Sequence, residues 1–471
     1  MTTTESTTLL DRVTVAPETG RPIPDAATRE IIGHAPVHTV TDLDAAVAAA
    51  RAAQPAWAAL GHEERSRILH AIADEIEANA EELAVLLSRE QGKPLDGPNA
   101  RFEVGASAAW VRNAADTAIE TEVVFEDGPA RSELHYEALG VVGAIGPWNW
   151  PMMITVWQIA PALRMGNAVV VKPSEYTPLS VLALASVFNR HLPADVLTVV
   201  SGDREVGAAI AAHPGVDKIM FTGSTATGRR IVESSANNLA RLTLELGGND
   251  PGIVLPDTDV SAIAENLFWG AFINTGQTCA ALKRLYVHES VYDEVVDALA
   301  ELARVIPMGR GLEEGNVLGP LQNEQQFGIV ARLVDDARSR GARVVSGGEP
   351  APELGPLFYR ATVVADIEDG AALVDEEQFG PVIPVVKYTD VDDAIARANA
   401  SSQGLGASVW SNDPEAAVEV ARRVQAGTVW INQHGAVNPN VPFGGTKASG
   451  YGHEFGVHGL KAVSSPKVIS R

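Results

Sequence analysis

One cysteine has the chemistry and the surroundings of a nucleophile. Cys279 is the single cysteine of the chain and lies in NTGQTCAALKR. Its small neighbours Gly276, Thr278 and Ala280 leave room for a substrate to approach the sulfur. A lone cysteine can also be a small buried hydrophobic residue. The run GQTCAAL favours the reactive interpretation, because a helix N-terminus predicted there would stabilise a thiolate.

A glutamate and an asparagine supply complementary groups. Glu245 follows an apolar run in LTLELGGND and precedes Gly247-Gly248, where the chain turns sharply. A carboxylate in such a partly dry site has a raised pKa and accepts a proton near neutral pH. Asn149, in PWNWP, has a Trp and a Pro on each side, so its amide can be held rigidly toward an oxyanion. A solvent-facing strand end and a turn cap are the plain structural alternatives for these two residues.

These three side chains together match the needs of oxidative acyl transfer. A thiolate attacks a carbonyl, a donor holds the oxyanion, hydride leaves, and a base activates water against the thioester.

The elements that must position these residues follow an alternating order. Helices are predicted at 42–58 and 62–90, the second ended by Gly92 and Pro94. Beyond residue 140, short apolar strands alternate with helices predicted at 160–166, 178–191, 205–213 and 226–237. A second alternating unit runs from about 250 to 435. This order predicts an α/β protein with two domains that each contain a parallel sheet.

Two segments differ from these units. Residues 121–140 are predicted to form a hairpin with a turn at Asp127-Gly128, and the tail AVSSPKVIS is predicted to be a strand. An exposed strand pair can join subunits or simply fray. The uncharged stretch 139–163 is long enough to cross a bilayer, but prolines near its centre would free backbone groups that lipid cannot satisfy. A buried strand, turn and helix is therefore predicted there.

Composition excludes several classes of partner. The net charge of −24 and the pI near 4.8 argue against nucleic acid and anionic membrane surfaces. One cysteine permits neither an intramolecular disulfide nor a cysteine-based metal site, and no metal is predicted. The start MTTTESTTLLDR lacks the features of a secretory signal, so a cytoplasmic location is expected. No G-x-G-x-x-G and no G-x-x-x-x-G-K-[ST] occurs, so any dinucleotide must be held in another way.

Seven segments occur in an order that resembles the NAD(P)-dependent aldehyde dehydrogenase superfamily over nearly the whole chain. They are PWNWP, VVKPSEYTP, FTGSTATG, LELGG, GQTCAA, EEQFGPV and PFGGTKASGYG. The resemblance implies a dinucleotide-binding domain (1–120 and 140–247), a catalytic domain (248–450) and a small β oligomerisation arm (121–139 and 455–471). It also implies a homodimer or homotetramer.

The resemblance further implies roles for the reactive residues. By similarity Cys279 is the nucleophile, Glu245 the general base, and Asn149 the oxyanion donor together with the Cys279 backbone N–H. Lys172 matches a lysine near the cofactor and the active site. Glu454 matches a second acid near the water path.

For the cofactor, the resemblance implies NAD, with NADP possible. Glu175 matches an acid that hydrogen-bonds the adenosine ribose hydroxyls, and a carboxylate there repels a 2′-phosphate. Trp148, Gly223 and Ser224 are expected at the pyrophosphate, near the start of the helix at 224–237. Glu377 resembles the residue that holds the nicotinamide ribose, and Phe379 the ring that positions the nicotinamide.

The substrate class is left open by the sequence. Trp150, Trp157, Thr278 and the loop 433–441 are expected to line the aldehyde tunnel. Aromatic walls suit an apolar aldehyde or a cationic aminoaldehyde. No arginine is assignable to a carboxylate, which disfavours a succinate-semialdehyde type of enzyme. Glu245 disfavours a CoA-acylating enzyme, and the intact reactive residues disfavour a non-enzymatic structural protein.

Overall fold

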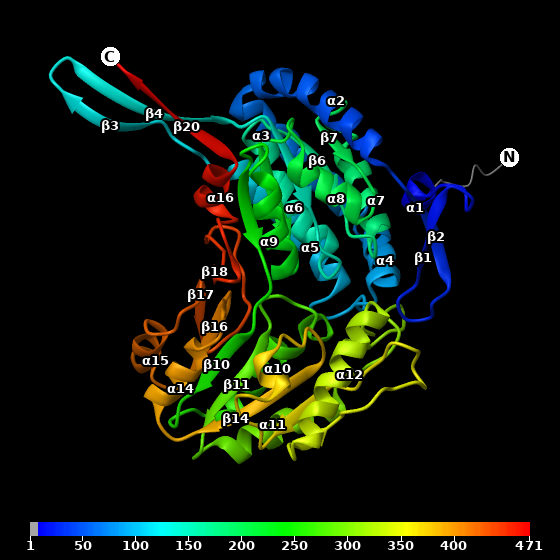
Figure 1. Ribbon diagram of the computed structural model, residues 1–471, viewed down its shortest axis with the longest axis vertical. Coiled ribbons are helices and arrows are strands. Elements are labelled where there is room, and N and C mark those ends of the chain that lie inside the picture. Colours follow the sequence, from blue (N-terminus) through cyan, green and yellow to red (C-terminus); the bar gives the residue numbers. More distant parts are fainter. Residues whose placement is uncertain (1–7) are drawn as a thin grey trace.

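The computed structural model describes residues 8–471, in which a six-stranded sheet is the centre of the upper lobe (Figure 1). Five of its strands are parallel. The three central ones are buried along their whole length, which explains their largely apolar sequences. A short antiparallel strand extends the edge. The order across the sheet is β19 (Gly450–Tyr451), β9 (Arg241–Glu245), β8 (Lys218–Thr222), β5 (Val141–Ile145), β6 (Ala168–Lys172) and β7 (Leu197–Val199).

Helices cover both faces of this first sheet. One face packs against α3 (Gly61–Ala78), α4 (Ala80–Gln91), α5 (Ala100–Asp116), α6 (Pro151–Arg164) and α7 (Pro178–Phe188). The other face packs against α2 (Val40–Ala59), α8 (Arg204–Ala212) and α9 (Thr225–Ser235). Helix α1 (Leu9–Val13) and the hairpin β1 (Gly20–Pro24) and β2 (Ile31–Pro36) lie beside α7 and α4.

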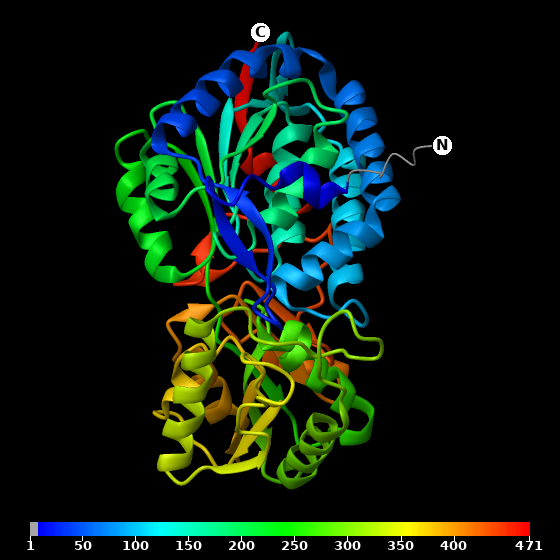
Figure 2. The same ribbon diagram turned by 90° about the vertical axis from the view of Figure 1, so that its right-hand side faces the viewer.

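A seven-stranded sheet forms the lower lobe (Figure 2). Only its edge strand β12 is antiparallel to its neighbour. The order is β12 (Arg343–Ser346), β13 (Thr362–Ala365), β14 (Val382–Tyr388), β11 (Leu282–His288), β10 (Asp250–Val254), β16 (Gly406–Trp410) and β17 (Thr428–Ile431). One face packs against α12 (Glu324–Ser339), α13 (Ala372–Asp375), α14 (Val391–Asn399) and α15 (Pro414–Ala421). The other packs against α10 (Val260–Phe272) and α11 (Tyr292–Val305).

Three strands form an arm that projects from the upper lobe (Figure 1). β3 (Glu122–Asp127) and β4 (Ala130–Ala138) make the predicted hairpin, with Gly128 at φ +58° in its turn, and β20 (Ser464–Ser470) pairs with β4. The edge strand β3 is exposed along its whole length. The preceding helix α16 (Gly456–Ala462) packs against α5 and α6. The two-residue strands β15 (Gln403–Gly404) and β18 (Thr446–Lys447) form a separate antiparallel pair.

The predicted α/β fold with two largely parallel sheets is confirmed, but two helices differ from their predictions. The helix predicted at 160–166 begins nine residues earlier, because it is the last part of α6. The helix expected at 62–90 is two helices, because Asn79 leaves helical geometry at φ −108° and ψ 15° and separates α3 from α4. The stretch 139–163 is the predicted buried strand, turn and helix, and Pro151 begins that helix, α6. The exact domain boundaries stay a prediction.

Within residues 8–471, none of the helices has both the length and the apolar content that crossing a lipid bilayer requires.

Candidate active site

The two lobes adjoin one another (Figure 2), and the site lies between them, lined by residues at the ends of strands from both sheets. From the first sheet come residues at the carboxyl ends of its parallel strands: Asn149 after β5, Lys172 at the end of β6, and Glu245 at the end of β9. From the second sheet come residues just before its strands: Cys279 before β11 and Glu377 before β14. Ligands of open α/β sheets bind at carboxyl ends of strands, and the second sheet closes this crevice.

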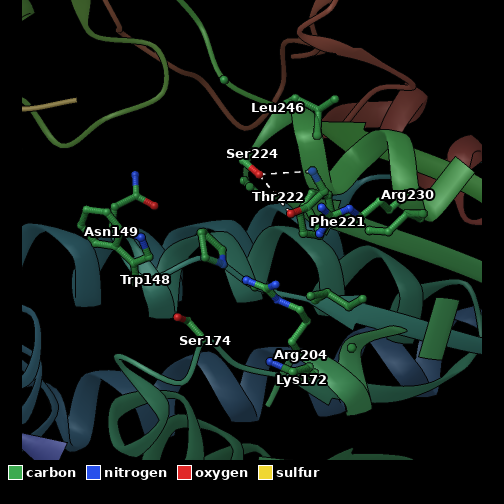
Figure 3. A pocket seen from close by; sticks show the side chains of 18 of the residues that line it. Trp148, Asn149, Lys172, Ser174, Arg204, Phe221, Thr222, Ser224, Arg230 and Leu246 are labelled. Atoms are coloured by element: carbon green, nitrogen blue, oxygen red, sulfur yellow. Dashed lines mark hydrogen bonds between the residues drawn. The ribbon is translucent and has the colours of Figure 1, made fainter. Parts of the chain in front are cut away.

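A cavity of about 530 Å³ occupies this crevice. Its lining brings together all the residues predicted to hold the cofactor, and with them Asn149 and Cys279. The predicted cofactor residues are Trp148, Lys172, Glu175, Gly223, Ser224, Glu377 and Phe379. In Figure 3, Trp148 and Asn149 lie at one end of the cavity, while Lys172, Ser174 and Arg204 lie along another wall. The volume falls within the ordinary range for small-molecule and cofactor sites.

Cations and a helix N-terminus give one part of this cavity an affinity for anions. Ser224 is the N-cap of α9, and its hydroxyl accepts a hydrogen bond from the Thr227 N–H. Lys172 Nζ lies 3.7 Å from a Glu175 oxygen. Arg204 and Arg230 also line the cavity, and neither makes an ion pair within residues 8–471. A dinucleotide pyrophosphate fits this combination.

The two arginines were missed in the sequence, where they are ordinary charged positions on α8 and α9. Only the packing of both helices beside the sheet edge brings them to the cavity (Figure 3).

Cys279 lies in a turn that leads into β11, so the helix N-terminus predicted beside it was wrong. A helix cannot continue here because Asn274, Thr275 and Gly276 all have left-handed backbone, at φ 51°, 57° and 74°. A side chain at Gly276 would collide with the Gly380 carbonyl. Burial raises the pKa of the half-buried Cys279 thiol to about 12.

Asn149 and Trp150 are tied to the turn that carries the thiol. The Asn149 amide donates to the Gln277 carbonyl at 2.9 Å, and Trp150 Nε1 donates to Thr278 Oγ1 at 2.9 Å. An amide carries two N–H donors, so Asn149 keeps one for a substrate. These bonds fix the distance between the first lobe and the thiol turn.

Glu245 and Glu454 form a buried acidic pair. Among residues 8–471, no side chain or backbone group makes a hydrogen bond to either Glu245 oxygen, although the residue is 4% exposed. Burial, reinforced by the charge of Glu454, raises the pKa of Glu245 well above its usual range. Burial also raises the pKa of Glu454 to about 8, partly offset by Lys218. Burying a carboxylate without hydrogen-bond partners costs free energy, so native proteins keep such a group mainly where it has a function.

Glu377 and Phe379 complete the wall near the thiol. Glu377 accepts from the Gly248 N–H at 3.2 Å and pairs with Lys283 Nζ at 3.2 Å. The rings of Phe379 and Trp148 meet edge to face at 5.4 Å. A planar group entering this end of the cavity would therefore meet an aromatic surface beside a carboxylate.

The predicted substrate-lining tryptophans lie in a neighbouring apolar cluster and do not line the 530 Å³ cavity. Trp157 packs edge to face on Phe455 at 4.7 Å and also contacts Phe443. Cys279 and Val437, from the loop predicted as a second wall, pack against the same cluster. Cys279 thus touches both the cavity and the aromatic cluster.

Three further charged residues near the site were missed in the sequence. Lys93 and Glu103 form a fully buried ion pair, and the Lys93 ammonium also donates to the Asn149 carbonyl at 2.8 Å. Lys283 is 1% exposed beneath the thiol turn. The sequence did contain a signal for Lys283. Lys283-Arg284 interrupts the apolar run in AALKRLYV, a pattern that indicates charges inside a buried strand.

No group of three or more His, Cys, Asp or Glu side chains suited to a metal ion occurs in the part of the chain that the structure describes.

A lone thiol beside a cavity with an anion-binding end, between two α/β lobes, fits an oxidoreductase that uses a nucleotide cofactor. The family model for the aldehyde dehydrogenase family matches residues 15–469, and the chain belongs to that family. It is an NAD(P)-dependent aldehyde dehydrogenase.

Relatives of known name share most of the chain. Phenylacetaldehyde dehydrogenase of Pseudomonas fluorescens is 41% identical, covering 94% of this chain and 91% of the relative. Aldehyde dehydrogenase LUC3 of Fusarium is 39% identical, covering 94% of both chains. The NAD+ complex of a Bacillus cereus aldehyde dehydrogenase superposes with a TM-score of 0.92 at 37% identity, covering 96% of this chain and 92% of that one.

Proposed function

We propose that the protein oxidises apolar aldehydes to carboxylic acids through a thioester on Cys279. The Cys279 thiol loses its proton to solvent, and the sulfur then forms a bond to the aldehyde carbon as the carbonyl π bond breaks. The Asn149 amide with the Cys279 N–H holds the resulting oxyanion. A nicotinamide held by Glu377 and Phe379 would supply the acceptor for the hydride that leaves this carbon. Glu245 then takes a proton from water, whose oxygen attacks the thioester carbon as the carbon–sulfur bond breaks.

The observation that carries this proposal is the buried Glu245 carboxylate beside the chain's single thiol. The chain that follows Glu245 passes against the thiol turn, because a side chain at Gly248 would collide with the Cys279 carbonyl. Both Glu245 oxygens are without partners among the described residues, which leaves them available to a water molecule. A base that was only structural would have hydrogen-bonding partners of its own.

The cavity residues support roles in binding the cofactor. Ser224, Gly223 and Trp148 would hold the pyrophosphate, and Glu175 the adenosine ribose hydroxyls, next to Lys172. Glu377 would hold the nicotinamide ribose while Phe379 limits where the ring can lie. Because Glu175 repels a 2′-phosphate, NAD is the favoured cofactor, and the nearby Lys172 weakens that preference.

The aromatic cluster favours an apolar aldehyde over an aminoaldehyde. Its members are aromatic, aliphatic or small, and the Lys93 ammonium that lies over the Trp150 ring is already paired with Glu103. A cationic substrate would gain only cation–π attraction there, whereas an apolar chain gains the full benefit of burial. The names of two relatives, phenylacetaldehyde dehydrogenase and geranial dehydrogenase, refer to aldehydes of this apolar kind.

The arm supports assembly into a homodimer or homotetramer. The edge strand β3 exposes Val123, Val124 and Phe125 by about half each, and β20 exposes Val468 and Ile469 similarly. Exposed apolar edge strands that bear no covering element are pairing surfaces.

The lack of any disulfide partner for Cys279 supports a cytoplasmic location.

The decisive experiment follows cofactor reduction by the purified enzyme with three aldehydes, each with and without CoA. We expect the highest kcat/KM for phenylacetaldehyde, a lower value for 4-aminobutanal, and the lowest for succinate semialdehyde. CoA should change none of these rates. If turnover depended on CoA, the acyl acceptor would be a thiol and not water. A preference for 4-aminobutanal would overturn the proposal that the substrate is an apolar aldehyde.

A further inference from the structure

Lys283 connects the two halves of the site. It is the second residue of β11, and its side chain is 1% exposed. Its ammonium donates to the carbonyl of Thr278 at 2.9 Å and to the carbonyl of Cys279, and it pairs with Glu377 Oε1 at 3.2 Å. An ammonium has three N–H donors, and here each has one acceptor, so the group is fully satisfied in one orientation.

The backbone around Lys283 strengthens this connection. Gln378 Nε2 donates to the Lys283 carbonyl at 3.0 Å, and the Lys283 ammonium lies 5.8 Å from the centre of the Phe379 ring. The segment that presents Glu377 and Phe379 to the cavity is therefore held to β11 by both the main chain and the side chain of one residue. Because this link is rigid and buried, a displacement of the Glu377–Phe379 segment also moves β11 and the thiol turn before it.

Charge gives the same residue an electrostatic role. Glu245, Asp250 and Glu377 act on the Cys279 thiol as negative groups, and Lys283 acts on it as a positive group. Its charge opposes the effect of burial and of the three carboxylates on the thiol. Because no helix N-terminus lies at Cys279, Lys283 supplies the positive charge that such a terminus would otherwise give.

We propose that Lys283 is a positioning residue that couples cofactor binding to the thiol. It fixes the thiol turn through two carbonyls, and its ion pair holds the Glu377 carboxyl group in the orientation that the cofactor ribose requires. This inference rests on the proposed roles of Cys279 and Glu377.

The test uses the fact that the chain has a single cysteine, so any thiol signal reports Cys279 alone. The pH dependence of alkylation by iodoacetamide gives its apparent pKa, and steady-state kinetics give kcat and the KM for NAD. In Lys283→Met we expect the thiol pKa to rise, with alkylation at fixed pH falling about tenfold for each unit of the rise. We also expect a higher KM for NAD and a lower kcat.

Three variants separate the possible explanations. Lys387→Met removes an exposed lysine from the adjoining strand β14 and should leave the thiol pKa and KM unchanged. Lys283→Gln keeps donors without charge, so it should recover part of kcat while the thiol pKa stays high. Glu377→Gln removes a carboxylate near the thiol and should lower the thiol pKa while raising the KM for NAD.

Wild-type alkylation and wild-type KM in Lys283→Met would overturn the proposal. Should that variant not fold, an unchanged thiol pKa in Glu377→Gln would overturn it as well. Failure of the proposed function is a separate result, because it would appear as dehydrogenase activity that survives in Cys279→Ala.

Discussion

Replacement of Lys93 by Met tests how firmly the Asn149 loop is held. Lys93 Nζ lies 2.5 Å from Glu103 Oε2, 2.8 Å from the Asn149 carbonyl and 3.4 Å from the centre of the Trp150 ring. The other Glu103 oxygen accepts from the N–H groups of Met152 and Met153, at the start of α6. Lys93→Met thus leaves a buried carboxylate without its counter-ion.

Both side chains of the pair are 0% exposed, so solvent screening does not reduce the loss. Removing one partner of a buried pair costs about 3–5 kcal/mol. The double variant Lys93→Met/Glu103→Gln removes the uncompensated charge and should recover more than half of that loss. An exposed pair gives the matched control: Arg67→Met breaks the bond to Glu64 on α3 and should cost less than about 1 kcal/mol.

The assay is urea unfolding followed by tryptophan fluorescence, to which Trp150 contributes directly. Turnover is measured on the same samples, and we expect kcat to fall more than the KM for the aldehyde changes, because Asn149 acts on the transition state. A Lys93→Met variant no less stable than Arg67→Met, or a double variant no more stable than the single one, would refute the reasoning.

Four further outcomes are expected. Cys279→Ala should retain NAD binding by calorimetry but keep less than about 1% of turnover, since the thiol does chemistry only. Glu245→Gln should give a burst of reduced cofactor and then very slow turnover, and mass spectrometry should detect an acyl-enzyme; without one, Glu245 would instead serve to deprotonate the thiol. Because the pKa values of Glu245 and Glu454 are raised, kcat should fall as pH drops, at a pH above the usual carboxyl pKa of 4.5, and Glu454→Gln should move this fall to lower pH. Glu175→Ser should narrow or reverse the preference for NAD in kcat/KM, and equal values for NAD and NADP in both forms would show that Glu175 does not face the ribose.

The first sheet was predictable from sequence because buried parallel strands are continuous apolar runs. The runs that begin at Val141, Ala168 and Lys218 all became strands of that sheet. The break at Asn79 was not predictable by the same means, because the apolar spacing continues on both sides of it.

The predicted site residues were individually visible in short motifs, but their supports were not. Lys283 acquires its role through Glu377, which lies far along the chain, and Lys93 acquires its role through the Asn149 carbonyl. Local sequence carries no information on such pairings. The helix N-terminus was wrongly predicted at Cys279 because small residues favour many conformations. The left-handed run at 274–276 brings Gly276 against Gly380, a contact between distant segments that local sequence does not reveal.

That left-handed run is shaped from outside by the long connection between α11 and α12. The Gly319 N–H donates to Thr275 Oγ1 at 2.9 Å, and the Gln322 N–H donates to Gln277 Oε1 at 2.9 Å. The connection at 306–323 therefore helps to fix the conformation of the thiol turn, even though it carries none of the reacting groups. Insertions at 306–323 should thus be tolerated less well than its irregular structure suggests, because a shift in register there would move Cys279 away from Asn149 without altering a single active-site residue.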